Sequence, residues 1–152
     1  MSDYLKKRHN VSVLLYHFVC PAKYRAIVFD IEGIDKTLKE ICLEMELRYE
    51  IRFIEIGVDD DHVHFLVQGI PTDSPSKLIQ RIKSITAREM FQREPRVKKV
   101  LWHSEFWTKG YFVSTVGFHG DESSIKNYIR NQGTGKNYKP LHQEELDLRS
   151  WL

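Results

Sequence analysis

The stretch from Asp59 to Val67 restricts the possible folds of this 152-residue chain more than any other. Three aspartates, typical of a turn, lead into an apolar run rich in β-branched and aromatic residues, which predicts a β-strand. Side chains alternate between the two faces of a strand, so His62 and His64 share one face, about 6–7 Å apart along the chain. The other face receives three apolar side chains, those of Val63, Phe65 and Val67. The strand therefore needs an apolar cover on one side and polar partners on the other.

Two neighbouring imidazoles can bind one metal ion, because neutral histidine is the commonest metal ligand in proteins. Histidines at this spacing can also pair with carboxylates or water at a sheet edge, and the stretch on its own slightly favours this simpler role. A metal site would need a further ligand from another part of the chain. His17 lies inside an earlier apolar segment, and we interpret it as a core histidine or as the partner of a ligand, rather than as a ligand itself.

Local patterns predict the other elements of the core. Strands are expected at 10–20, 51–57 and 111–117, and amphipathic helices at 35–49 and 75–91. The order strand, helix, strand, strand, helix, strand is that of the split βαβ, or ferredoxin-like, arrangement. This is an α+β fold, in which a four-stranded antiparallel sheet carries two helices on one face. The helices would cover the apolar face of the histidine strand and leave both histidines on the open face.

An additional helix is predicted at 121–132, after the ferredoxin-like unit is complete. Tyr128 and Gln132 stand four residues apart and therefore lie on one face of this helix. If the helix lies on the open face of the sheet, Gln132 could offer its carbonyl oxygen to a metal ion bound by the two histidines, with Tyr128 one turn away. Mixed nitrogen and oxygen ligands suit Mg²⁺ or Mn²⁺. A packing tyrosine and a surface glutamine are the simpler alternative.

The length of the chain fits one domain over 1–152, with a core at 1–132 and a joint and tail at 133–152. The first ten residues do not resemble a targeting segment, and no apolar run approaches membrane-spanning length, so no membrane partner is expected. Cys20 and Cys42 form no CxxC pattern. We expect them to be core residues in a reducing cytoplasm.

The distribution of charge is more informative than the net charge of +2. Eight Lys and Arg residues against two Glu lie between positions 77 and 99, among them Lys83 and Arg88. Such a segment is usually a solvated helix face, but it can also bind phosphates. Lys23, Tyr24 and Arg25 place two cations around an aromatic ring, which could contact a nucleic-acid backbone and stack on a base, or could form an ordinary surface loop.

His62-Val63-His64 resembles the HUH motif (His, bulky hydrophobe, His) of single-tyrosine DNA endonucleases. The whole chain resembles the small transposases of the simplest bacterial and archaeal insertion sequences. The matching segments occur in the family's order and are 16–17 with 23–25 (YH and KYR), 61–64 (DHVH), 78–87 (LIQRIKSITA), 101–102 with 105–107 (LW and EFW), 111–117 (YFVSTVG) and 128–132 (YIRNQ). The HUH pattern alone is short, but its combination with YFVSTVG and YIRNQ is specific.

The resemblance implies a defined reaction on single-stranded DNA. Tyr128 would attack a backbone phosphate, which gives a 5′-phosphotyrosine link and a free 3′-OH. His62, His64 and Gln132 would be the ligands of a divalent cation, and no other cofactor is implied. Members of the family act as dimers, in which the tyrosine helix of one subunit can complete the histidine site of the other. Their substrates carry hairpins near the ends of the element.

Three alternatives stay open at this point. A relative adapted to cut genomic palindromic repeats would use the same chemistry on a different target, and so would a replication-type nickase. A ferredoxin-like module that binds nucleic acid without cutting it would carry the two histidines by chance. Covalent capture of single-stranded DNA separates the enzymes from the binding module.

Overall fold

The computed structural model describes residues 5, 13–101, 105–117, 126–127, 129–131 and 141. The strands are β1 (Leu14–Pro21), β2 (Arg52–Val58), β3 (His62–Gly69) and β4 (Phe112–Val116). The α-helices are α1 (Ile34–Arg48) and α2 (Pro75–Arg93). Three short 3-10 segments are η1 (Lys23–Arg25), η2 (Val28–Asp30) and η3 (Pro95–Lys99). The strands and α-helices follow one another in the order that the sequence predicts, and the 3-10 segments lie between them.

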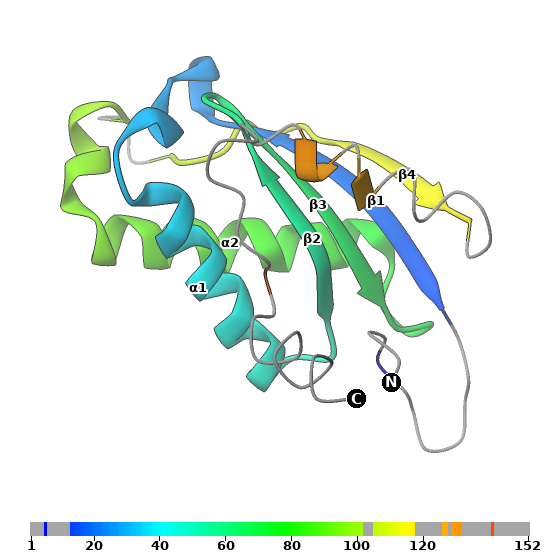
Figure 1. The fold of residues 1–152 in the computed structure, drawn as a ribbon. Coiled ribbons are helices and arrows are strands. Elements are labelled where there is room, and N and C mark those ends of the chain that lie inside the picture. The colour runs from blue at the N-terminus through cyan, green and yellow to red at the C-terminus, as the bar shows by residue number, and fades with distance from the viewer. Residues whose placement is uncertain are drawn as a thin grey trace, which may run out of the picture.

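The four strands form one antiparallel sheet in the order β2-β3-β1-β4. Both α-helices pack on the same face of this sheet (Figure 1). The α+β class, the four-stranded antiparallel sheet and the pair of helices on one face are therefore confirmed. The second and third strands, β2 and β3, pair antiparallel and form a hairpin.

The core lies between the sheet and the two helices. The apolar face of β3 packs against side chains from both helices, and all of these residues are buried: Val63, Phe65 and Val67 from β3, Leu38 and Ile41 from α1, and Leu78 and Ile82 from α2. Cys20 and Cys42 are buried free thiols in this core, as predicted. Burial in apolar surroundings raises the pKa of Cys20 to about 12.

The helix boundaries follow the local signals closely. Ser74 caps α2, since its Oγ accepts a hydrogen bond from the backbone N–H of Lys77 at 3.1 Å, and Pro75 occupies the first turn. α1 follows Gly33, whose φ of +88° suits a residue without a side chain. No helix among the described residues is both long enough and apolar enough to span a bilayer.

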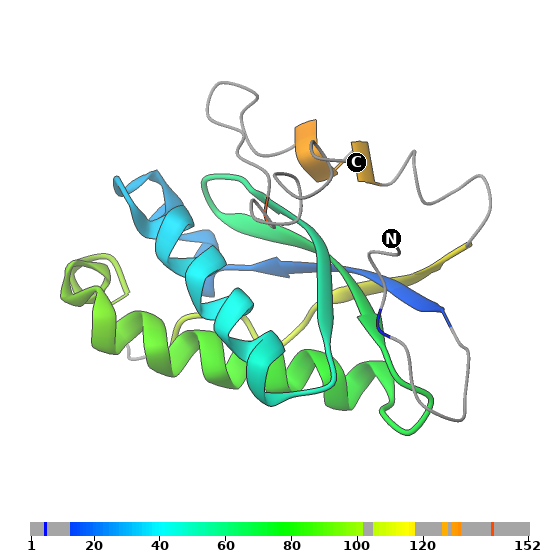
Figure 2. The same cartoon turned by 60° about the horizontal axis from the view of Figure 1, so that its bottom comes forward.

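The predicted helix at 121–132 falls only partly within the described residues. Positions 126–127 and 129–131 are helical. They lie on the opposite side of the sheet from α1 and α2 (Figure 2, orange). Tyr128 and Gln132 lie outside the described residues, as does the predicted tail at 133–152 apart from residue 141.

Candidate active site

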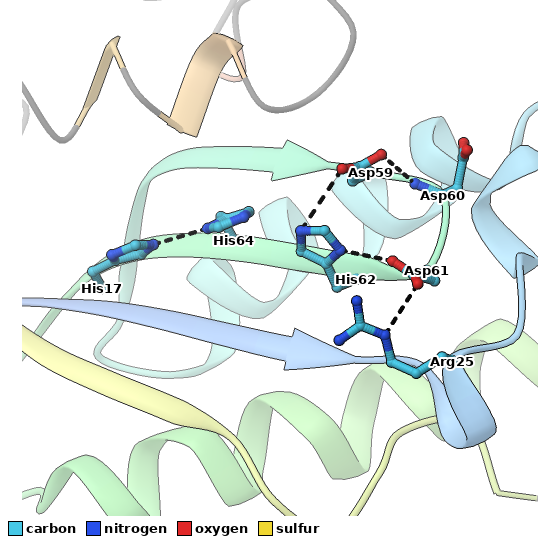
Figure 3. A network of polar contacts seen from close by, with 7 residues as sticks. All are labelled: His17, Arg25, Asp59, Asp60, Asp61, His62 and His64. Carbon is cyan, nitrogen blue, oxygen red and sulfur yellow. Dashed lines mark hydrogen bonds and ion pairs between the residues drawn. The ribbon is translucent and has the colours of Figure 1, made fainter.

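His62 and His64 lie side by side on the open face of β3, as the alternation predicts. Their ring centroids are 5.0 Å apart and the rings are tilted by 67° to each other. Each ring has a polar neighbour at its Nδ1 atom (Figure 3). The neighbour of His62 is a carboxylate, and the neighbour of His64 is another histidine.

His62 is oriented by the acidic turn that precedes the strand. Its Nδ1–H donates to Asp61 Oδ1 at 2.8 Å, and its Nε2 lies 3.8 Å from Asp59 Oδ2. Asp61 also accepts a hydrogen bond from Arg25 Nε at 3.0 Å. The pKa of Asp61 is lowered, first by the hydrogen bond from His62 and then by Arg25. An ionised carboxylate therefore fixes the orientation of the His62 ring.

His64 is more deeply buried, at 5% exposure, and its neighbour is another histidine. His17 of β1 lies diagonally across the β1–β3 pairing, with its Nε2 at 3.0 Å from His64 Nδ1. Burial, followed by the proximity of His17 and His62, lowers the pKa of His64 to about 4, and burial also lowers the pKa of His17. Both rings are therefore neutral at pH 7, the form in which imidazole binds metals.

Among the described residues, His62 and His64 are suited to bind one cation together. Because each Nδ1 has a protein partner, a metal ion shared by His62 and His64 would bind through the two Nε2 atoms. Among the described residues, no three His, Cys, Asp or Glu side chains gather into a metal-binding group. A further ligand would have to come from another part of the chain, and the predicted one, Gln132, lies outside the described residues.

The KYR segment lies beside His62, at the end of β1. The backbone N–H of Ala22 donates to the Asp61 carbonyl at 2.8 Å, which joins this segment to the acidic turn. Tyr24 and Arg25 both have positive φ, +57° and +54°, a conformation that costs a non-glycine residue about 1–3 kcal/mol. Tyr24 is 70% exposed. Lys23 pairs with Glu105 at 2.7 Å.

Lys83 and Arg88 lie on α2, in the layer opposite the open face of the sheet (Figure 2). Lys83 Nζ donates to the backbone carbonyl of Thr108 at 2.6 Å, and two further carbonyls lie at 3.1 and 3.3 Å. Burial lowers the pKa of Lys83. Arg88 is exposed and lines a shallow hollow between α1 and α2. The structure therefore brings Arg25 to Asp61, beside His62, and places Lys83 and Arg88 on α2 in the opposite layer.

The open face of the sheet also receives Ile129 and Arg130, which follow Tyr128 in the sequence. Gly57 of β2 pairs with His64 of β3, and a Cβ atom on Gly57 would lie 2.1 Å from the carbonyl oxygen of Ile129. Ile129 is fully buried, in a second apolar cluster with Leu15, Ile54, Leu66 and Val116. Arg130 Nη2 lies 3.2 Å from Oε2 of Glu55, which is 2% exposed. Neither contact was predicted from the sequence, although a glycine inside a strand can indicate a close backbone approach.

Comparisons with known proteins give the family. The family model described as "Transposase IS200 like" matches residues 10–132. The chain belongs to this family. The resemblance seen in the sequence is therefore confirmed, and this IS200-like transposase has its histidine strand, its KYR segment and the residues flanking Tyr128 all within the matched region.

Curated relatives of this IS200-like transposase include the transposases for insertion sequence element IS200 of Salmonella typhimurium and Salmonella typhi. Each is 29% identical over 120 residues, which cover 77% of this chain and 75% of the relative. A candidate transposase from Deinococcus radiodurans R1, known from a crystal structure, is 29% identical. Its TM-score is 0.59, and the match covers 84% of this chain and 97% of that one.

A second solved structure shares the fold at low identity. It is a REP-associated tyrosine transposase bound to a REP hairpin, with a TM-score of 0.58 and 12% identity. The match covers 91% of this chain and 76% of that chain. This structural similarity agrees with the α+β fold described above.

We expect Gly57→Ala to displace the 126–131 segment from the sheet, because the new methyl group would overlap backbone atoms of Ile129. The resulting loss of packing should lower the free energy of unfolding by about 1–3 kcal/mol. Hydrogen exchange of peptides covering 126–131 should become faster. Gly110→Ala is the matched control, since nothing lies within 4 Å of the position that its methyl group would take, and it should leave both measurements unchanged. Equal protection of the segment in both variants would contradict the proposed close approach.

Proposed function

We propose that this IS200-like transposase cuts and rejoins single-stranded DNA at the ends of an insertion sequence, with Tyr128 as the nucleophile. The supporting observation is the placement of His62 and His64 on the face of the sheet that also receives Ile129 and Arg130, the two residues after position 128. Gly57, which contacts Ile129, is the direct pairing partner of His64. The contacts of Ile129 and Arg130 with this face support the choice of the neighbouring Tyr128 as the nucleophile.

The proposed reaction exchanges one phosphate ester for another. The Oη atom of Tyr128 forms a bond to phosphorus, the bond from phosphorus to the 3′-oxygen breaks, and a 5′-phosphotyrosine and a free 3′-OH result. The phenol loses its proton and the leaving 3′-oxygen gains one. A free tyrosine has a pKa of about 10, so its hydroxyl needs activation and close positioning to attack at neutral pH.

His62, His64 and Gln132 would bind the divalent cation, Mg²⁺ or Mn²⁺. When bound, such an ion polarises a phosphate oxygen and stabilises the charge that develops during attack. The neutral state of His64 and the Nδ1 partners of both rings support this assignment. Two histidines and one amide oxygen would leave coordination positions for the DNA.

Lys23, Tyr24 and Arg25 are the residues that we propose to contact DNA beside the site. The exposed ring of Tyr24 could stack on a base, and the cations on either side could contact the backbone. DNA contacts of Lys83 and Arg88 stay a prediction from charge alone. The REP-associated transposase is bound to a hairpin, and we propose that this chain likewise binds hairpins at the ends of its element, as a homodimer in the cytoplasm.

Covalent capture tests the proposed nucleophile. With Mn²⁺ and a single strand carrying the element end, the wild-type chain should form an adduct that survives denaturing electrophoresis. Tyr128→Phe should form none, because it lacks the attacking oxygen, yet it should bind the same hairpin with unchanged affinity. His64→Ala should bind the hairpin as well and cleave it at a strongly reduced rate. An adduct in Tyr128→Phe would remove Tyr128 from the mechanism.

The salt dependence of DNA binding tests the basic residues. Each phosphate contact that is lost should reduce the log–log slope of affinity against salt by about 0.7 for a single strand. We expect this loss in a Lys23→Ala, Arg25→Ala double variant. The same titration with Lys83→Ala and Arg88→Ala decides whether α2 contacts DNA, provided that thermal unfolding shows an intact fold. An unchanged slope in the first variant would place the DNA elsewhere.

Mixing two inactive variants tests whether the active site is shared between subunits. If the tyrosine of one subunit acts with the histidines of its partner, a mixed dimer of Tyr128→Phe and His64→Ala contains one intact site. Cleavage should then return on mixing, at up to half the wild-type level per mixed dimer. No recovery, with mixed dimers shown by light scattering or native mass spectrometry, would mean that each subunit uses its own tyrosine.

A further inference from the structure

His17 is a buried polar residue in direct contact with His64, and the proposed reaction does not use it. It is 7% exposed, and its ring stacks on that of His64 with centroids 5.2 Å apart and an angle of 20° between the planes. Phe112 of β4 meets the His17 ring edge-on, at 6.1 Å and 74°. The ring of His17 is therefore in contact with an aromatic ring from each of the two strands that flank β1.

Metal binding by His64 would determine which of the two rings donates the hydrogen bond between them. A neutral imidazole carries one N–H, and a nitrogen that binds a metal ion carries no hydrogen. If His64 binds through Nε2, its hydrogen must lie on Nδ1, and this Nδ1–H must donate to His17 Nε2 across the 3.0 Å contact. His17 then acts as the acceptor, with its own hydrogen on Nδ1.

The location explains why a neutral acceptor is used here. The other histidine, His62, donates to the carboxylate of Asp61, whose side chain is 27% exposed and also receives Arg25. At the depth of His64 an ionised acceptor would lose its hydration, which is costly unless a cation pairs with it. A second imidazole accepts the hydrogen bond without burying a charge.

We propose that His17 is a positioning residue for His64: it accepts a hydrogen bond from Nδ1 and keeps the ring turned so that Nε2 can bind the divalent cation. The inference rests on the metal site of the proposed function. It assigns to His17 a role in metal affinity, and it does not require His17 to contact DNA or the ion. Partners of this kind typically change metal affinity about 10–100-fold when they are removed.

The test compares two substitutions that differ in the acceptor. His17→Phe retains an aromatic ring that can stack on His64 but has no acceptor, whereas His17→Gln offers an amide oxygen near the position of Nε2. Mn²⁺ is titrated into each protein without DNA, and free Mn²⁺ is followed by its paramagnetic resonance signal. We expect His17→Phe to weaken Mn²⁺ binding about 10–100-fold. His17→Gln should recover most of the affinity, with thermal unfolding in EDTA as the control for folding.

The outcomes separate this inference from the function on which it rests. Equal Mn²⁺ affinity in wild type and His17→Phe would make His17 a packing residue only. If the wild type binds Mn²⁺ no better than His62→Ala and His64→Ala do, His62 and His64 do not form the metal site. The proposed role of His17 would then be wrong as well.

A measurement on the wild-type chain covers the case in which His17→Phe does not fold. Nitrogen-15 spectra of the imidazoles with Mg²⁺ should show His17 with its hydrogen on Nδ1. The tautomer with hydrogen on Nε2 would overturn the proposal.

Discussion

The antiparallel pairing of β1 with β3 is the interaction on which both the core and the site depend. Its register places Pro21 opposite His62, Val19 opposite His64 and His17 opposite Leu66. Side chains alternate along each strand, so a shift of β3 by one residue would turn its histidines toward the helices and its apolar residues toward the open face. The burial of Val63, Phe65 and Val67 under α1 and α2 therefore fixes the face on which the histidines lie.

The fold was predictable because its signals are local, whereas much of the site was not. The alternation in β3 and the Ser74-Pro75 cap of α2 each follow from a few neighbouring residues. Contacts between segments carry no such signal: the carbonyl contacts of Lys83 depend on the course of residues 108–110, and its charge suggested DNA instead. The positive φ of Tyr24 and Arg25 could not be predicted either, because neither residue type favours that conformation.

His62 and His64 have different surroundings, although they lie two positions apart on one strand. His62 belongs to a partly exposed network of ionised groups, in which the acidic turn and the KYR segment meet. His64 belongs to a buried and neutral environment made by β1. The neighbours of His62 tolerate solvent and charge, so they can lie where a DNA phosphate would approach. On the β2 side of His64, its pairing partner Gly57 lies against Ile129, which belongs to the second apolar cluster.

The ion pair of Glu55 with Arg130 bears on how the 126–131 segment could move. Glu55 is almost inaccessible, so departure of the segment would remove the Arg130 guanidinium from a buried carboxylate. Removing one partner from a buried pair typically costs about 3–5 kcal/mol. In the proposed dimer an exchange of segments between subunits would avoid this cost, because Arg130 and Ile129 of one copy would replace those of the other over the same Glu55 and Gly57. The end states would then be nearly equal in energy, and the barrier would lie in the passage between them.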